Sequence, residues 1–551
     1  MSNQNLHEKT KEELIEIVKK LKRQKKYGLV WEDKPENVVE QCKQELPVLE
    51  EVKDKAIEAD PSGPTNLLIE GDNYHALSVL NYTHAGKIDV IYIDPPYNTG
   101  ASDWKYNNDY VDGNDTYRHS KWLSMLNNRL SIAKNLLKTT GVLICTIDEN
   151  EHATLGLLLS EVFPNYDIAC ISIVHNPAGV QGKNFSYTHE YAYFVYPSNG
   201  RYIGKTTREN DLVSPLRDWG TVSKREQAKN CFYPIYVKDS KITGYGDVCP
   251  DDFHPGKPNI ELENGTTAIY PIDIHGVERK WVFSRNSVEK ITGQLSIKKV
   301  KKEFVVIRSK SETSYKTVWE DKKYYANIYG SKLLNTLIST SFPFPKSLYA
   351  VVDCIKACIH PRNAIILDFF AGSGTTGHAV EILNKEDGGK RRFILCTNNE
   401  NGIARDVCYP RIKAVIDGSD KLPDVTGIKA NLRYFVTDFV KKSKVSDDTK
   451  REMVVRSAEM ICVKENSFSK ISDNKKYKIY KNNETITGVL FDLDALAEFK
   501  EKINEQKMPA HLYVFSLTND TYGADFDDLG VDHELCPIPE SILEVYRKLF
   551  K

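Results

Sequence analysis

Residues 87–100 read KIDVIYIDPPYNTG and predict a buried strand that ends at a rigid turn. Four consecutive apolar residues, 90–93, are typical of a central parallel strand that is covered on both faces. Pro95 and Pro96 cannot donate hydrogen bonds to a neighbouring strand, and each restricts the residue before it, so the strand stops at Asp94. Open α/β sheets bind ligands at this carboxyl edge, which makes Asp94 a candidate ligand-binding side chain.

The turn presents two fixed hydrogen-bond acceptors beside an aromatic ring. The Asp94 carboxylate is one, and the Pro95 carbonyl is the other, because Pro96 brings no N–H to occupy it. Tyr97 supplies the ring. These residues predict a receptor for a flat group that carries an amino function. The simpler alternative is a structural turn, in which Asp94 caps and the prolines stiffen the backbone.

A second strand-to-loop motif lies far along the chain. The apolar run 364–367 ends in Asp368, and residues 369–377 then read FFAGSGTTG. The loop satisfies G-x-G-x-x-G, in which glycine lets the backbone approach a ligand closely, but it lacks the lysine of a P-loop. Glu400, after the next predicted strand, is placed to hold ribose hydroxyls. The motif therefore predicts a nucleoside-bearing cofactor, and it fits a dinucleotide-binding turn equally well.

Strands and helices alternate around both motifs, which predicts an α/β fold with a doubly wound, mostly parallel sheet. Periodicity is irregular over residues 164–344, and a loop over residues 98–115 is expected to cover the site. At 551 residues the chain exceeds one ordinary core. We expect an N-terminal helical arm and linker (1–60), two halves of one core (61–163 and 345–431), an inserted mixed α+β region (164–344) and a small C-terminal α/β domain (432–551).

The composition is that of a globular protein, with 40% hydrophobic and 27% charged residues. No apolar run approaches the roughly 18 residues that span a bilayer, and the polar N-terminus carries no secretory signal. The 11 cysteines include no C-x-x-C pair, so we expect reduced structural cysteines and no metal site. These features predict a cytoplasmic protein without membrane association.

The formal net charge of −1 means that contact with nucleic acid needs a local basic surface. The irregular region supplies seven candidates, which are Arg217, Lys224, Arg225, Lys298, Lys299, Lys301 and Lys302. A solvated surface is the simpler interpretation of the lysine cluster, but its place between the two core halves favours nucleic-acid contact. A basic helix over residues 10–26 is interpreted as solvated, with a dimer contact or a grip on DNA as alternatives.

The two motifs together resemble the DNA amino-methyltransferases that use S-adenosylmethionine, specifically the permuted beta class. In that class the catalytic motif precedes the glycine loop, and the target-recognition region lies between them. The chain has this order, at residues 94–97, 164–344 and 370–375. The surrounding sequence resembles the Mod subunits of Type III restriction-modification systems. The matching stretches are LVWEDKPENVVEQCKQELPVLEEVKDK, NLLIEGDNYHALSVLNYTHAGKIDVIYIDPPYNTG, YRHSKWLSMLNNRL and ILDFFAGSGTTGHAV.

The resemblance implies site residues by matching position. The catalytic motif corresponds to Asp94, Pro95, Pro96 and Tyr97. The strand end and loop that cradle the methionine part of the cofactor correspond to Asp368, Phe370, Ala371, Gly372, Ser373, Gly374 and Thr375. Glu400 resembles the ribose ligand, and Asp72 resembles the acidic residue at the adenine of the cofactor. Lys346 lies in a segment, 341–347, that resembles the other cofactor wall, although the family usually has Pro where Ser347 stands.

The resemblance implies methyl transfer from S-adenosylmethionine to the N6 amino group of an adenine flipped out of double-stranded DNA. A branch that methylates cytosine N4 more often resembles Ser-Pro-Pro-Tyr, so Asp94 favours adenine. A DNA-reading scaffold that directs a nuclease is a compatible alternative, and a dinucleotide oxidoreductase is a more distant one. Expected partners are DNA, a second copy of the chain and a Res-type ATP-dependent nuclease. The expected setting is the nucleoid of a bacterial-type cytoplasm.

Overall fold

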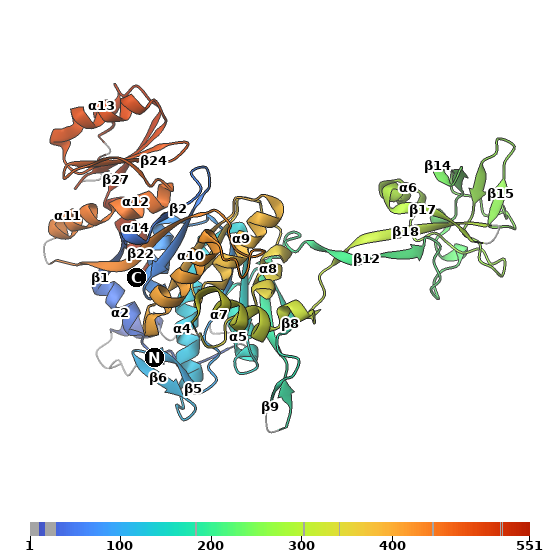
Figure 1. Ribbon diagram of the computed structural model, residues 1–551, viewed down its shortest axis with the longest axis horizontal. Helices are drawn as coiled ribbons and strands as arrows, with labels where there is room; N and C mark the ends of the chain where they lie inside the picture. The colour runs from blue at the N-terminus through green and yellow to red at the C-terminus, as the bar shows by residue number, and fades with distance from the viewer. Residues whose placement is uncertain are drawn as a thin grey trace. The chain divides into compact units, whose positions relative to one another are not determined.

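The computed structural model describes residues 10–16, 29–181, 184–300, 303–340, 342–443, 446–517, 520 and 522–550 (Figure 1). The chain divides into two compact units. We call Met1–Ile203 with Lys316–Lys551 the core unit, and Gly204–Tyr315 the inserted unit. Among the described residues, every helix is too short or too polar to cross a membrane.

Within the described residues, an 11-stranded sheet organises the core unit, in the order β1-β22-β3-β21-β20-β4-β7-β11-β8-β19 with β2 beside β22. Its strands are β1 (Glu45–Glu51), β2 (Ile57–Glu58), β3 (Thr65–Glu70), β4 (Ile88–Ile93), β7 (Leu137–Ile147), β8 (Tyr166–Val174), β11 (His189–Pro197), β19 (Val318–Trp319), β20 (Ile365–Asp368), β21 (Arg392–Thr397) and β22 (Asn431–Lys441). From β22 to β7 all neighbours are parallel, whereas β11 is antiparallel to both β7 and β8. The expected α/β fold with a mostly parallel sheet is confirmed.

Helices pack on both faces of this sheet. One layer contains α3 (Asn73–Thr83), α4 (Arg118–Ala133) and α5 (His152–Val162), and the other contains α8 (Leu348–Ala357), α9 (Thr375–Asp387) and α10 (Tyr409–Asp417). Two further helices of the core unit are α2 (Asn37–Gln44) and α7 (Leu333–Ile338).

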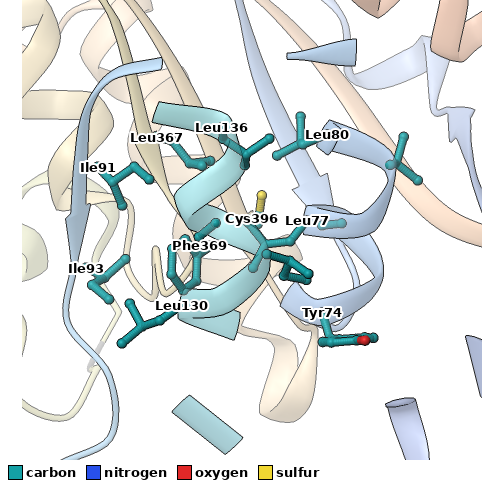
Figure 2. Close-up of a cluster of buried hydrophobic side chains, with 14 of the residues drawn as sticks. Tyr74, Leu77, Leu80, Ile91, Ile93, Leu130, Leu136, Leu367, Phe369 and Cys396 are labelled. Carbon is teal, nitrogen blue, oxygen red and sulfur yellow. The ribbon is translucent and has the colours of Figure 1, made fainter. Parts of the chain in front are cut away.

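Successive residues of the central strands face these two layers in turn. Figure 2 shows Ile91 of β4 and Cys396 of β21 in one apolar cluster with Leu77 of α3. Phe393 and Leu395 of β21 point to the opposite face from Cys396 and lie against α9. A Cβ on Gly377 of α9 would meet both side chains. Because both faces are covered, the strands read as continuous apolar runs.

The inserted unit consists of two antiparallel sheets. One is β12 (Lys205–Pro215), β18 (Glu303–Ser314) and β17 (Leu295–Val300); the other is β14 (Lys241–Tyr245), β13 (Ile235–Lys238), β16 (Thr267–Ile269) and β15 (Asn259–Glu261). A short helix, α6 (Arg285–Val288), adds to them. The sequence placed the start of an irregular region at residue 164, but β8 and β11 belong to the large sheet. Only residues 204–315 form a separate unit.

The C-terminal α/β element has a five-stranded sheet of β23 (Ser469–Asp473), β24 (Tyr477–Lys481), β25 (Ile486–Leu490), β26 (Ala510–Phe515) and β27 (His533–Ile538). Its helices are α11 (Ser446–Arg456), α12 (Ala458–Glu465), α13 (Leu496–Gln506) and α14 (Glu540–Leu549). The Tyr546 hydroxyl of α14 donates to the Pro47 carbonyl at 2.5 Å, and Ile542 joins the large apolar cluster. This element therefore packs on the core unit.

The expected loop over residues 98–115 contains a hairpin instead, formed by β5 (Ala101–Tyr106) and β6 (Asp109–Asp112). Trp104, Tyr106 and Val111 are buried in the large apolar cluster. Asn107 and Asn108 both have positive φ, 52° and 72°, as a two-residue hairpin turn requires. Of the basic helix expected over residues 10–26, only residues 11–16 are described as helical, and residues 17–26 lie outside the described residues.

Candidate active site

The two sequence motifs meet at one edge of the large sheet. β4 and β21 both pair with β20 in parallel, and β3 pairs with β21, so the carboxyl ends of all four strands lie side by side. Asp94 follows β4, the glycine loop follows β20, Glu400 follows β21 and Asp72 follows β3. The side chain of Asn73 donates to the Phe369 carbonyl at 2.9 Å and so joins two of these ends. Residues some 300 positions apart in sequence thereby form one site.

Asp94 uses one of its oxygens for contacts within the protein. Its Oδ1 accepts a hydrogen bond from the Thr146 hydroxyl at 2.7 Å and lies 3.2 Å from the Lys346 ammonium. Among the described residues both of these contacts fall on Oδ1, which leaves Oδ2 for a ligand. The side chain is 26% exposed. Burial raises the pKa of Asp94, and the Lys346 charge opposes that rise.

The proline turn is fixed from outside the motif. The Trp122 indole donates to the Pro96 carbonyl at 2.7 Å. Asn98, directly after the Asp94–Tyr97 motif, has φ 58° and is fully buried. Its side chain donates to Glu151 at 2.5 Å. These bonds hold the Asp94–Tyr97 segment in one shape, and no described donor reaches the Pro95 carbonyl. Asp94 Oδ2 and the Pro95 carbonyl, the two hydrogen-bond acceptors predicted from the sequence, therefore have no described donor within the protein.

Sequence reasoning missed a buried acid in this site, Glu190 of β11. The Lys346 ammonium lies 2.5 Å from Glu190 Oε2 and also contacts the Tyr97 hydroxyl. The Tyr97 hydroxyl donates to the same Glu190 oxygen at 3.0 Å, and the ammonium lies 4.4 Å from the Tyr97 ring centroid. Although burial alone would lower it, Asp94 and Glu190 raise the pKa of Lys346 to about 12. Lys346, expected at a cofactor wall, is thus also in contact with the catalytic motif.

The signals for the missed residues are weak in sequence. Glu190 is a charged residue at the start of an apolar strand, and Thr146 is the polar residue near the end of the strand beside β4. Thr146 lies opposite Ala192 in the β7–β11 pairing, which brings both strands to the site. Because that pairing is antiparallel and non-local, no local motif reports it.

Hydrogen bonds to Asp368 fix the glycine loop. Asp368 accepts from the Phe370 amide at 2.9 Å and from the Thr376 hydroxyl at 2.5 Å, and burial raises its pKa to about 7. A Cβ on Gly372, where φ is 49°, would be in ordinary van der Waals contact with the Phe342 ring at 3.5 Å and the Phe370 carbonyl oxygen at 3.9 Å. A Cβ on Gly374, where φ is 78°, would lie 3.0 Å from Cys408 Sγ. A side chain at Gly374 would therefore crowd Cys408, whereas at Gly372 the positive φ is the stronger reason for glycine.

Arg411, which the sequence did not single out, supports the same loop. Its buried guanidinium donates to the Thr375 hydroxyl at 2.7 Å and to the Ser373 hydroxyl at 3.2 Å. Both hydroxyls are thus committed within the protein. Ala371 is also buried, and Phe370 is partly buried against the large apolar cluster.

The two remaining cofactor candidates lie at the ends of β3 and β21. Asp72 caps α3 by accepting from the Tyr74 amide at 2.7 Å, and the buried Arg129 lies 3.2 Å from its Oδ1. Glu400 contacts the β5–β6 hairpin, because its Oε1 is 2.7 Å from the Lys105 ammonium and 3.4 Å from the Tyr110 hydroxyl. Both carboxylates keep about a third of their surface exposed, at 31% for Asp72 and 30% for Glu400.

The basic candidates of the inserted unit differ in what they contact. Lys224, Lys298 and Lys299 are exposed. Arg217 is partly buried, donates to the Ile272 carbonyl and lies 4.3 Å from the Trp219 ring centroid. Lys301 and Lys302 lie outside the described residues.

Arg225 holds the inserted unit together. Its buried guanidinium pairs with Glu278 at 2.8 Å and donates to the Phe253 carbonyl at 2.7 Å. Its charge is therefore engaged inside the protein, unlike the charges of the exposed lysines. The described residues contain no group of three or more His, Cys, Asp or Glu side chains that is arranged to hold a metal ion.

A family model described as DNA methylase, of the N6_N4 type, matches residues 88–407. The chain belongs to this family of DNA methylases. The match spans both motifs and the inserted unit, so the resemblance inferred from the motifs is confirmed and the protein is an enzyme. The Type II methyltransferase M.KpnI of Klebsiella pneumoniae is 31% identical over 378 residues, which cover 66% of this DNA methylase and 86% of that protein.

Mod subunits of Type III restriction-modification enzymes are also similar to this DNA methylase. The EcoPI subunit of Escherichia phage P1 is 29% identical over 385 residues, and the StyLTI subunit of Salmonella typhimurium is 29% identical over 399 residues. The matches cover 61% and 65% of this chain but only 58% and 56% of the two Mod subunits. The chain therefore matches little more than half the length of these relatives.

Solved structures give weaker likenesses. The M1.HpyAVI–SAM complex has a TM-score of 0.30 and 13% identity, and covers 63% of this chain and 98% of its own. The cytosine-N4-specific PvuII DNA methyltransferase has a TM-score of 0.34 and 9% identity, and covers 64% and 89%. At TM-scores this low we draw no conclusion from the likeness.

Proposed function

We propose that this DNA methylase transfers a methyl group from S-adenosylmethionine to the N6 amino group of an adenine held outside the DNA duplex. One observation carries the proposal. Asp94 has its Oδ1 bound by Thr146 and Lys346, while its Oδ2 and the Pro95 carbonyl stay available at the sheet edge that also carries the glycine loop.

The residues at the strand edge fit the proposed cofactor. Gly372 has no side chain and a positive φ, so the bare backbone of the loop is the part that can approach the methionine part closely. The exposed part of the Glu400 carboxylate suits two ribose hydroxyls, and that of Asp72 suits the adenine. When bound, S-adenosylmethionine supplies the electrophilic methyl group of its sulfonium. A dinucleotide is not favoured, because the family match is to methylases.

The amine acceptor site explains how adenine becomes reactive. The lone pair of the adenine N6 atom is delocalised into the ring, so the free amine is a poor nucleophile. Asp94 Oδ2 and the Pro95 carbonyl each accept one of its two hydrogens, which favours a pyramidal nitrogen with a localised lone pair. The turn is rigid, so it supplies this geometry without reorganisation, and positioning is a large part of the effect. After transfer, Asp94 is the acceptor closest to the proton that nitrogen loses.

Adenine is proposed over cytosine because Asp94 stands at the first position of the motif, where the branch that methylates cytosine N4 more often resembles Ser-Pro-Pro-Tyr. The partly buried Tyr97 ring, whose centroid lies 4.4 Å from the Lys346 ammonium, is the proposed surface on which a flipped base stacks. A base inside a duplex cannot reach a pocket at the edge of a sheet, so the proposal includes base flipping.

The inserted unit is the proposed reader of the target sequence. It carries 19 Lys and Arg against 15 Asp and Glu, a net +4, although the whole chain has a formal net charge of −1. A local positive surface is what duplex DNA attracts. The exposed Lys224, Lys298 and Lys299 are the proposed phosphate contacts, and Lys301 and Lys302 are added from the sequence.

Two braced turns of the inserted unit add apolar side chains to this proposed DNA surface. Arg217 donates to the Ile272 carbonyl, and Arg279 bridges the Ser223 hydroxyl and Asp273 at 2.8 Å each, which ties the two turns together. Their tips present Trp219, Val222 and Ile274, which are 57%, 58% and 80% exposed. Rigidly held apolar tips suit insertion between DNA bases.

A modification subunit of a Type III system is the proposed context, since several relatives carry the name Mod. A Res-type nuclease is then the proposed partner. A stand-alone Type II enzyme is the second candidate, because the match covers 86% of M.KpnI but 58% of the EcoPI Mod subunit. Co-expression with a Res-type nuclease subunit separates them: a copurifying complex supports the first, and complete protection of DNA by the chain alone with no complex supports the second.

Labelled S-adenosylmethionine and duplex DNA test the activity itself. We expect the wild-type protein to label DNA, and Asp94→Ala to lose labelling while still binding DNA and cofactor. Asp94→Asn keeps the shape but not the charge, and serves as the matched control for the carboxylate. Unchanged labelling by Asp94→Ala would remove Asp94 from its proposed role.

A further inference from the structure

The Lys346 ammonium stands between two carboxylates and lies closer to the one outside the catalytic motif. It is 2.5 Å from Glu190 and 3.2 Å from Asp94. Glu190 is 5% exposed and Lys346 is 12% exposed, so neither charged group is well solvated by water. At such burial the loss of solvation is offset only by good pairing geometry and further hydrogen bonds, which the Tyr97 hydroxyl supplies here.

This arrangement decides the net charge at the acceptor site. With Glu190 present, one cation faces two anions and the cluster carries a net negative charge. Without Glu190, Lys346 would pair with Asp94 alone and the cluster would be neutral. A neutralised Asp94 is a weaker hydrogen-bond acceptor for an amine and a weaker base for the proton that leaves it.

We propose that Glu190 is a positioning residue that draws Lys346 away from Asp94 and so preserves the charge with which Asp94 binds the substrate amine. Glu190 touches Lys346 and the Tyr97 hydroxyl, and it acts on the substrate only through them. The inference rests on the proposed methyl transfer and adds a residue that lies outside both sequence motifs.

The same geometry fixes the direction in which Asp94 responds to each charge. The Glu190 anion raises the pKa of Asp94 and the Lys346 cation lowers it. Other titratable groups near the cluster are Tyr92, Cys145, Asp148, His175, Cys354 and Asp368. Burial lowers the pKa of His175 and raises the pKa of Asp148 to about 6 and of Asp368 to about 7, so single pH profiles contain more than Asp94. Two variants that shift the acidic limb of the pH profile in opposite directions identify the contribution of Asp94.

The test measures kcat and KM for methyl transfer across pH in Glu190→Gln and Lys346→Met. Glutamine keeps the size of the side chain and an oxygen that can accept from Tyr97, but it removes the charge. We expect Glu190→Gln to lower kcat at least about tenfold, with less change in KM, and to move the acidic limb of the kcat profile to lower pH. Lys346→Met should move that limb to higher pH.

Tyr97→Phe is the matched control, because it removes the hydroxyl that contacts both Glu190 and Lys346 without removing a charge. We expect it to leave the acidic limb in place. The proposal is overturned if Glu190→Gln, shown by its thermal melting curve to be folded, keeps the wild-type kcat and the wild-type acidic limb of the pH profile. It is also overturned if Glu190→Gln and Lys346→Met move the acidic limb in the same direction. If Glu190→Gln does not fold, the direction in Lys346→Met decides. Absence of methyl transfer in the wild-type protein would instead refute the proposed function.

Discussion

The acceptor site of the core unit and the surface of the inserted unit use charge in opposite ways. Asp94, Glu190 and Lys346 are largely buried, and each contacts another member of the group. Lys224, Lys298 and Lys299 are exposed. A buried charge without a partner is very costly, so its contacts reveal its role, whereas an exposed charge contributes by its sign and number. Arg225 is the exception within the inserted unit, since it is buried and paired.

Arg225 therefore gives the strongest test of the difference between buried and exposed charges. Arg225→Met removes the cation from Glu278 and from the carbonyls that it holds, and we expect it to destabilise the inserted unit by about 3 kcal/mol. Chemical denaturation of the full chain, followed by tryptophan fluorescence, measures this. Lys224→Met, at the neighbouring exposed position, should stay within about 0.5 kcal/mol of wild type. Equal stability of the two variants would show that burial does not separate these charges.

Gly372 sharpens the description of the cofactor edge. Gly372→Ala adds a methyl group to the loop backbone that is proposed to approach the cofactor and strains a residue with φ 49°, so we expect cofactor affinity to fall at least about tenfold. Titration calorimetry with S-adenosylmethionine measures it. Gly388→Ala is the control, because Gly388 also has positive φ, 67°, with no atom near the added Cβ, but lies outside the loop. Equal loss of affinity in both would point to general strain.

Trp219 tests whether the apolar tips of the inserted unit contact DNA. Because stacking of an aromatic side chain on a base contributes about 1–3 kcal/mol, Trp219→Ala should weaken DNA binding about tenfold. Fluorescence anisotropy with a labelled duplex follows the change. Val300, 45% exposed on β17, provides a matched apolar control, and Val300→Ala should bind like wild type. An unaltered affinity in Trp219→Ala would leave the tips without a role in DNA contact.

The smallest expected effect belongs to a single exposed lysine. Lys299→Ala removes one proposed phosphate contact, so affinity should fall only a few-fold for every DNA sequence alike. The slope of log affinity against log salt should decrease by about 1. Salt titrations of the wild type and the variant compare these slopes directly. An identical slope would place Lys299 away from the DNA backbone.

Much of the fold and the centre of the site could be predicted from sequence because the signals there are local. The prolines after Asp94 end β4 whatever surrounds them, and continuous apolar runs reported strands covered on both faces. Asp94 and the glycine loop follow neighbouring strands, so the parallel topology alone brings them to one edge.

The residues that sequence reasoning missed depend on non-local pairing. Glu190 reaches Lys346 only because β11 lies beside β7, and β11 reads in sequence as one of several tyrosine-rich runs. The β5–β6 hairpin was missed because its Asn, Asp and Gly content suggested a loop, although Trp104 and Tyr106 alternate as a strand requires. The predicted start of the inserted unit, residue 164, was wrong for the same reason that Glu190 was missed: β8 and β11 join the large sheet by non-local strand pairing.

The chemical identity of the methylated base tests the central claim most directly. Duplex DNA is incubated with the protein and S-adenosylmethionine that carries a deuterated methyl group, and the digested nucleosides are analysed by mass spectrometry. The account predicts deuterated N6-methyladenine in wild-type reactions and none with Asp94→Ala. Deuterated N4-methylcytosine as the product, or N6-methyladenine formed equally by Asp94→Ala, would contradict it.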